Sequence, residues 1–226
     1  MRKLLYVPII HTESELGSVA SAIESKSAAL VGEEKWAKHK EVVGKFWENL
    51  AHYFDSLDAA NLKIYQDGLL ADGELGRRIV EEAARRDSKN HQIILNLVEK
   101  GAELVKTEET DLLKEEYKHI MRLAQSKSVV GKSIAFTKYK LRKGRLLKER
   151  DKFVAETIDQ TLKEGETGVL FMGSHHNVLP YLPEDIVVEQ VKDRERINLY
   201  FKYLISRIGR RRFEQLAEYL ASSSAP

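Results

Sequence analysis

Cysteine is absent from the 226 residues of this chain. Its absence excludes disulfide bonds, thiolate metal ligands and a cysteine nucleophile, and it is consistent with a reducing compartment. An excess of one charge is also lacking, because the net charge is only +2. Such a chain has no global field that would draw it to nucleic acid or to an anionic membrane. We therefore expect neither a nucleic-acid partner nor a membrane partner.

Long apolar runs are missing as well. No stretch approaches the about 20 apolar residues that a bilayer-spanning helix needs. Met1-Arg2-Lys3 and the apolar residues behind it imitate a secretory signal. However, Pro8 interrupts that short run, and His11 and two glutamates come before the first small-residue pattern. The sequence therefore predicts a cytoplasmic protein.

Linkers, repeats and several common motifs are absent. No Pro/Gly/Ser-rich linker divides the chain, which predicts a single domain over residues 1–226 with a frayed tail at 221–226. The chain has no dinucleotide-binding glycine fingerprint, no HExxH motif and no esterase nucleophile elbow. Gly131-Lys132-Ser133 is similar to the end of a phosphate loop, but Ser126 stands where that loop requires glycine, so we reject this interpretation.

What the chain does contain is a series of short runs rich in Val, Ile, Leu and aromatic residues, which are typical of strands buried on both faces. They are Lys3–Ile10, Leu62–Gln66, Ala102–Lys106, Gly168–Met172 and Asp185–Val191. Strands separated by helical segments indicate an α/β fold. We predict a mostly parallel central sheet of about five strands flanked by helices, with a helical insert after the first strand.

Apolar residues at helical spacing predict the helices between these strands. One extends from Trp36 to Leu57, a second carries Ile93–Val98 and ends at Gly101, and Asp111 caps a third over Leu112–Met121. A long helix is expected over Lys148–Leu162, and another over Asp193–Leu220 with an interruption at Gly209. The last of these is amphipathic and could pair between two subunits of a homodimer.

The residues that follow the strands are the best functional lead. His11 follows the first strand, Asp67 the second, Glu108 and Glu109 the third, and His175-His176 the fourth. In open α/β sheets the ligand crevice lies just outside the carboxyl ends of the strands. If the strands are parallel, two histidines and two or three carboxylates meet there, behind Gly173, whose missing side chain would let a ligand approach closely.

Such a set has two chemical uses. Two neutral imidazoles and a carboxylate bind Zn, Mn, Co or Fe, and the metal lowers the pKa of a bound water to about 7. Without a metal, a histidine–carboxylate pair is an oriented general base toward water. Each residue also has a structural interpretation: a histidine at a strand end caps backbone groups, and Asp67-Gly68 is a common turn.

The stretch Lys138–Lys152 is densely basic. It lacks the interleaved aromatic residues of a nucleic-acid stacking surface, so a solvated helical face is the favoured interpretation. An interaction module that uses this helix and the C-terminal helix stays open as an alternative.

These features together resemble the TraB/Tiki superfamily, which is related to erythromycin esterases and ChaN-like proteins. Glu149-Arg150-Asp151, followed by a strand that ends in Gly173-Ser174-His175-His176, is similar to the closing module of that family, in which an E-R-(D/N) helix precedes a strand ending in GxxH. LLYVPIIH is similar to its opening module, with Pro8 in place of the glycine, and GAELVKTEETDLL to its acidic segment.

The resemblance implies a sheet flanked by helices, with the two GxxH histidines at one crevice. By carry-over, His11 and His176 are metal ligands or general bases, and Glu108 or Glu109 and Asp67 complete the site. The implied metal ligands are His11, Glu108 and His176. Arg150 is then either a fixed cation for a developing oxyanion or a member of a structural ion pair.

We therefore expect a hydrolase of a peptide, amide or ester bond that acts on a peptide or small-molecule substrate, with or without a divalent metal such as Mn, Co, Zn or Fe. The alternative is a non-catalytic protein that holds haem, iron or a small ligand at the same edge. For that alternative Tyr6 and Tyr65 are candidate iron ligands.

Overall fold

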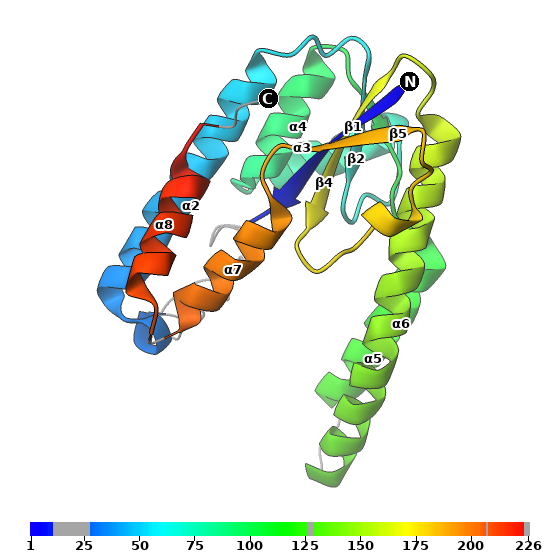
Figure 1. Cartoon of the computed structure of the whole chain (residues 1–226). Helices are drawn as coiled ribbons and strands as arrows, with labels where there is room; N and C mark the ends of the chain where they lie inside the picture. Colours follow the sequence, from blue (N-terminus) through cyan, green and yellow to red (C-terminus); the bar gives the residue numbers. More distant parts are fainter. Residues whose placement is uncertain (11–27, 126–128, 207, 224–226) are drawn as a thin grey trace.

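The computed structural model describes residues 1–10, 28–125, 129–206 and 208–223. The strands are β1 (Arg2–Ile9), β2 (Leu62–Gln66), β3 (Glu103–Val105), β4 (Thr167–Gly173) and β5 (Ile186–Gln190). The helices are α2 (Glu33–Asp55), α3 (Gly73–Arg85), α4 (Lys89–Glu99), α5 (Thr110–Gln125), α6 (Val129–Thr161), the 3-10 helix η2 (Leu179–Tyr181), α7 (Arg194–Ile205) and α8 (Arg210–Ala221). Figure 1 shows the strands side by side with helices on both sides.

The strands form one five-stranded sheet in the order β3-β2-β4-β1-β5, and every pairing between neighbours is parallel. The predicted α/β fold is therefore confirmed, and each predicted strand is present to within about two residues. Because the strands are parallel, their carboxyl ends lie along one edge, as the assignment of the site residues requires.

Alternating side chains of β1 divide the core into two layers. Leu5, Val7 and Ile9 belong to the larger layer, whereas Leu4 and Tyr6 belong to the smaller one. The strand is nearly continuous in apolar character because both of its faces are covered, as is usual in parallel sheets.

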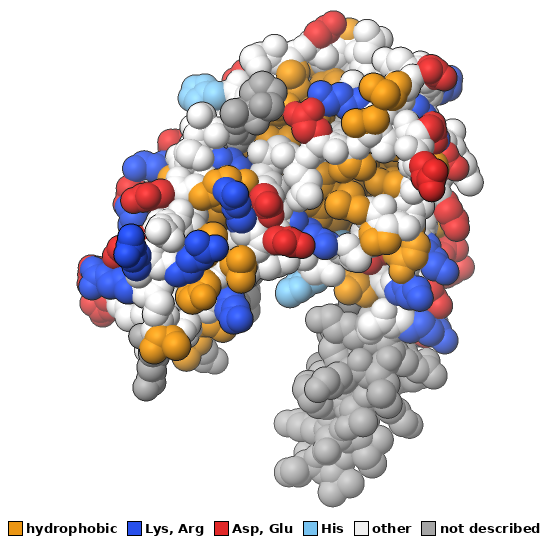
Figure 2. Space-filling model, viewed as in Figure 1, with side chains coloured by type: hydrophobic (Ala, Val, Ile, Leu, Met, Phe, Trp, Pro, Cys, Tyr) orange, Lys and Arg blue, Asp and Glu red, His pale blue; other side chains and the backbone are white. Residues whose placement is uncertain are grey.

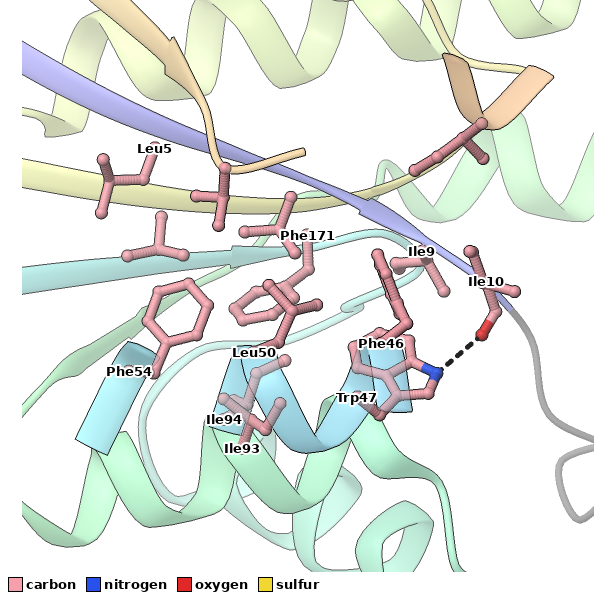
Figure 3. Packing of buried hydrophobic residues seen from close by; sticks show 14 of the residues in the cluster. Leu5, Ile9, Ile10, Phe46, Trp47, Leu50, Phe54, Ile93, Ile94 and Phe171 are labelled. Atoms are coloured by element: carbon pink, nitrogen blue, oxygen red, sulfur yellow. Dashed lines mark hydrogen bonds between the residues drawn. The ribbon is translucent and has the colours of Figure 1, made fainter. Parts of the chain in front are cut away.

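The larger layer is packed against α2, α4, α7 and α8. Phe46, Leu50 and Phe54 project from α2 toward the sheet, where Phe54 meets Phe171 of β4 (Figure 3). Trp47 Nε1 donates a hydrogen bond of 3.0 Å to the carbonyl oxygen of Ile10. The residue that precedes His11 is thereby fixed at the carboxyl end of β1.

The smaller layer lies under α6. Its helical residues Val154, Ala155, Ile158 and Leu162 are spaced so that one stripe of α6 faces the sheet. The segment carrying η2 packs against the same layer. Figure 2 shows hydrophobic side chains exposed between η2 and the edge strand β5. Of the elements that the structure describes, fewer cover this layer than the other one.

Three helical predictions differ from the structure. Helix α6 begins at Val129, well before the predicted start at Lys148. It therefore includes the basic stretch Lys138–Lys152, for which a helical face is the favoured interpretation, and Lys and Arg are good helix formers. Helix α5 begins at Thr110, so Asp111 lies in its first turn and is not the cap. Helix α3 was not predicted, because it presents few apolar residues.

The predicted break at Gly209 is present between α7 and α8, where this glycine has φ of 82°. None of the described helices is both long enough and apolar enough to cross a bilayer.

Candidate functional site

The elements that follow the neighbouring strands β1 and β4 in the chain pack on opposite faces of the sheet. After β1 the chain reaches α2, which packs on the larger layer, and after β4 it reaches η2, which packs on the smaller one. Neighbouring strands whose connections leave on opposite faces create a topological switch point, the usual position of a ligand site in such sheets. The predicted site residues follow these strands and their neighbours.

The structure sorts these residues into buried and exposed positions. Glu108 and His176 are buried, with side chains 1% and 7% exposed, whereas Glu109 and His175 are exposed. Glu108 is therefore the glutamate that joins the group, and His176 the histidine. His11 lies outside the described residues, so its predicted role stays a prediction.

The turn after β2 brings two of the acids together. Leu69 N–H donates to the carbonyl of Gln66, and Gly68 adopts a left-handed conformation with φ of 83°. The carbonyl of Leu69 then accepts hydrogen bonds from the N–H groups of Thr107 at 2.9 Å and Glu108 at 3.1 Å. The segment after β3 is thus tied to the segment after β2, which places Glu108 beside Asp67.

A buried amide network supports the same turn from behind. Asn90 donates to the side-chain oxygen of Gln66 at 3.0 Å, and the Gln66 amide donates to the carbonyl of Asp67 at 2.9 Å. Both amide side chains are almost fully buried. The backbone of Asp67 is therefore held by α4 as well as by β2.

Arg150 of α6 joins the two carboxylates. Its Nε donates to both oxygens of Glu108, at 3.0 and 3.1 Å, and its Nη2 donates to Glu108 and, at 3.2 Å, to Asp67. Burial raises the pKa of Glu108, and the guanidinium of Arg150 opposes that rise. Of the two predicted roles for Arg150, the ion pair is present.

His176 is held by a second residue of the same helix. Its Nδ1 lies 2.6 Å from Oδ1 of Asp151, and Oδ2 of Asp151 accepts the N–H of Asn177 at 3.0 Å. The N–H of His176 donates to the carbonyl of Gly173 in the turn that follows β4. The imidazole is therefore fixed by a buried carboxylate that is itself fixed by the backbone.

The other ring nitrogen faces Asp67. Nε2 of His176 lies 3.6 Å from Oδ2 of Asp67, which is too long for a direct hydrogen bond. Oδ2 also accepts the N–H of Gly173 at 3.2 Å. A carboxylate can only accept, so the network assigns the proton of the neutral imidazole to Nδ1, toward Asp151, and leaves a lone pair on Nε2. Two acceptors then face each other, and a water proton, a cation or a substrate proton fits between them.

Gly173 is required by this arrangement. A Cβ atom at this position would lie 3.0 Å from Oδ2 of Asp67 and 3.7 Å from Cδ2 of His176. The sequence predicts that a ligand approaches this glycine closely. In the structure the Asp67 carboxylate and the His176 ring approach it.

Two residues of the site, Asp151 and Arg194, have no role in the sequence-based prediction, and a third, Tyr6, has a different one. Asp151 belongs to the E-R-D segment. It lies one turn before Val154 on the buried stripe of α6, and a polar residue on a buried stripe indicates a specific partner or function. Arg194 of α7, whose Nη1 donates to the carbonyl of His176, has no comparable signal. Tyr6 was considered only as an iron ligand, yet its hydroxyl lies within electrostatic range of Arg194 and Asp151.

Tyr65, the other proposed iron ligand, points to the opposite edge. Its hydroxyl lies 2.8 Å from Oγ1 of Thr161, near the end of α6, and Glu166 and Glu103 at the amino edge act on it. It does not belong to the group around His176.

The described residues do not by themselves provide a complete metal site. Both oxygens of Glu108 are engaged by Arg150, which leaves His176 Nε2 and Asp67 Oδ2 as the two donors that face each other. Within the described ranges no group of three or more His, Cys, Asp or Glu side chains is arranged to hold a metal ion. The predicted set of His11, Glu108 and His176 stays a prediction.

Comparison of the chain with protein-family models, with curated proteins and with solved structures finds no match. The resemblance of the GxxH and E-R-D segments to the TraB/Tiki superfamily accordingly stays a prediction. A function has to be inferred from the geometry of the site itself.

Proposed function

We propose that this protein is a hydrolase of peptide, amide or ester bonds in which His176, oriented by Asp151, is the general base toward water. The observation that carries the proposal is the pair formed by Asp151 and Nδ1 of His176 at 2.6 Å. Asp151 fixes both the tautomer and the direction of the ring, so that Nε2 faces the carboxyl edge of the sheet with a free lone pair.

In the proposed reaction His176 carries out both proton transfers. Water attacks the carbonyl carbon while Nε2 of His176 takes one of its protons. The tetrahedral intermediate then collapses, and the leaving alcohol or amine departs with the proton that the imidazolium returns. The products are a carboxylic acid and the alcohol or amine, and Asp151 stabilises the transient imidazolium.

Asp67 is suited to position the attacking water. Its Oδ2 lies on the far side of the gap from Nε2 and is fixed by the N–H of Gly173, while Oδ1 is bound by Arg150. A water between them can donate one proton to Nε2 and the other to the carboxylate. Glu108 and Arg150 are positioning residues in this scheme, because they hold Asp67 without facing the gap.

Hydrolysis of a panel of p-nitrophenyl esters and p-nitroanilides by the purified chain tests the proposal. His176→Asn and Asp151→Asn are compared with His175→Asn, a matched control, because His175 is the exposed neighbour in the same turn. We expect kcat to fall by a factor of about 100 to 10,000 for His176→Asn, the range found for general bases, and no change for His175→Asn. Absence of turnover from the whole panel, or full activity of His176→Asn, would overturn the proposal.

A metal would supply a water of lowered pKa at the same edge. Two measurements distinguish a metal-assisted reaction from one in which His176 acts without a metal. One is elemental analysis of the purified wild type beside His176→Asn, and the other is hydrolysis before and after treatment with a chelator. One equivalent of metal that is absent from His176→Asn supports a metal-assisted reaction. Activity that survives the chelator supports the histidine acting alone.

The alternative prediction, a protein that binds haem or iron, has a separate readout. Burial raises the pKa of Tyr6 to about 12, which disfavours the phenolate that an iron ligand requires. We therefore expect the Soret band of added haem to stay that of free haem, whereas a sharpened and shifted band that reverts in Tyr6→Phe would favour this alternative.

A further inference from the structure

Tyr6 carries a polar atom that the fold leaves without a partner. The residue is 0% exposed, and its hydroxyl oxygen is buried and has no hydrogen-bond partner among the described residues. A buried hydroxyl without a partner is costly, and in native proteins such an atom usually meets a ligand or an ordered water. The hydroxyl therefore indicates a polar group that occupies this place when the protein functions.

The hydroxyl lies at the proposed active site. The positive charge of Arg194 acts on it and lowers its pKa, whereas Asp151 and Asp67 raise it, so all three lie within electrostatic range. The Arg194 guanidinium lies beside the hydroxyl oxygen and lowers its pKa both as a charge and as a neighbouring donor, while the hydroxyl proton has no acceptor among the described residues. Through Nη1 the same guanidinium holds the carbonyl of His176. Arg194 thus contacts the proposed base, His176, directly, and Tyr6 lies beside Arg194.

Both side chains are donors at neutral pH. Burial raises the pKa of Tyr6 to about 12, so the phenol keeps its proton. Arg194 donates through Nη1 to the carbonyl of His176, and its guanidinium also lies beside the Tyr6 hydroxyl. Arg150, by contrast, is engaged by Glu108 and Asp67. The proton of the Tyr6 hydroxyl therefore has no acceptor among the described residues, and a second donor, Arg194, lies beside it.

The local charge indicates which group they bind. Asp67, Glu108 and Asp151 stand against only two arginines, so a dianion such as phosphate would be repelled. The acyl oxygen of an ester or amide is neutral before the reaction, gains charge in the tetrahedral intermediate and belongs to a singly charged carboxylate in the product. Donors aimed at a charge that develops during the reaction stabilise the transition state most.

We propose that the Tyr6 hydroxyl and the Arg194 guanidinium bind the acyl oxygen of the substrate and, after hydrolysis, one oxygen of the product carboxylate. This inference rests on the proposed function for its substrate class. Tyr6 donates a hydrogen bond through its O–H, and Arg194 supplies a positive charge and a second donor. No covalent bond forms at either residue, and neither one transfers a proton.

Binding of acetate, a product analogue, tests this assignment without any need for turnover. The melting temperature of the full chain is measured against acetate at constant ionic strength, with inorganic phosphate as a second probe. The variants are Tyr6→Phe and Arg194→Gln. The matched controls are Tyr65→Phe, which removes a hydroxyl on the same sheet face at the other edge, and Arg196→Gln, which removes an exposed guanidinium on the same helix.

We expect a saturable rise in melting temperature with acetate and a weaker one with phosphate. Hydrogen bonds to charged groups are worth enough that Tyr6→Phe should weaken acetate binding about 10- to 100-fold. Arg194→Gln should do the same, and both controls should bind like the wild type. Without acetate, Tyr6→Phe should melt at or above the wild-type temperature, because it removes an unpaired hydroxyl, whereas Tyr65→Phe should melt lower.

His176→Asn separates this inference from the proposed function, because it should lose turnover and keep acetate binding. Acetate binding in a chain that hydrolyses nothing would support a carboxylate site at Tyr6 and Arg194 and refute the hydrolase. If acetate fails to stabilise the wild type, if phosphate binds more tightly than acetate, or if Tyr6→Phe binds acetate as well as the wild type, the assignment of Tyr6 and Arg194 is wrong.

Discussion

At the scale of single residues, Glu108 and Arg150 form a deeply buried ion pair at the site. The Glu108 side chain is 1% exposed and the Arg150 side chain 14% exposed. Removing one partner of such a pair leaves an uncompensated charge, whereas removing both can be nearly neutral. The pair is therefore expected to fix the geometry of Asp67 rather than to add net stability.

Glu108→Gln should lower the free energy of unfolding by about 3 kcal/mol, because it leaves Arg150 without its main counterion. Urea unfolding measures the effect. Glu109→Gln is the control, and at this exposed position a change of less than about 0.5 kcal/mol is expected. The double variant Glu108→Gln/Arg150→Met should recover part of the loss. If the double variant loses at least as much unfolding free energy as the two single variants together, the pair is not coupled in this way.

Gly173→Ala should disturb the site more than the fold. The new Cβ would lie 3.0 Å from Oδ2 of Asp67, so the carboxylate has to shift away from the gap beside His176. We expect kcat of the hydrolase to fall by at least tenfold, while the free energy of unfolding falls by about 1 kcal/mol, a typical cost for one overpacked methyl group. Unchanged kcat in this variant would show that the position of Asp67 does not matter for the reaction.

At the scale of elements, helices α2 and α7 are joined by a buried polar contact. Nδ1 of His39 lies 2.9 Å from the hydroxyl of Tyr200, and burial lowers the pKa of His39 from 6.5 to about 4. The unfolded chain therefore binds a proton between these two values that the folded chain does not bind. The stabilising effect is present above pH 6.5 and is lost as the pH falls toward 4.

The free energy of unfolding should accordingly fall by about 2 to 3 kcal/mol between pH 7 and pH 4.5 because of His39 alone. Urea unfolding at a series of pH values measures the wild type and His39→Gln, whose amide can still reach Tyr200. The difference between the two curves isolates this residue from the other titrating groups. Parallel curves would contradict a neutral, buried His39.

The junction of α7 and α8 depends on Gly209. Its φ of 82° lies in the left-handed region, and a Cβ atom would lie 2.7 Å from a ring carbon of Tyr203. Gly209→Ala should therefore lower the free energy of unfolding by about 1 to 2 kcal/mol. The exposed helical Gly44, whose Cβ would meet nothing within 4 Å, is the control, and Gly44→Ala should raise stability by about 0.5 to 1 kcal/mol. Equal effects at both positions would contradict this account of the junction.

At the scale of the whole molecule, the parallel sheet could be predicted because each strand is a short apolar run between helical segments. The same pattern located Asp67, Glu108 and His176, since Asp67 follows β2 directly and the other two lie within three residues of the ends of β3 and β4. Asp151 and Arg194 could not be placed in this way. They come from helices, and only tertiary packing brings α6 and α7 to the carboxyl edge.

The remaining differences have similar causes. The choice between Glu108 and Glu109 depends on which side chain turns inward, and hydrogen bonds to the carbonyl of Leu69 decide it. The sequence does not show that the Tyr6 hydroxyl lacks a hydrogen-bond partner, because Tyr6 stands in the strand like any buried aromatic residue. Burial and partners, which are properties of the folded chain, distinguish functional polar groups from structural ones.

The tautomer of His176 tests the account most directly, since a general base needs its lone pair on Nε2. A long-range ¹H–¹⁵N correlation spectrum of ¹⁵N-labelled protein, recorded at a pH where the imidazoles are neutral and assigned with His176→Asn, measures it. We predict a proton on Nδ1, bound to Asp151, and an unprotonated Nε2. A proton on Nε2 in the neutral ring would contradict the account, because that nitrogen could then take no proton from water.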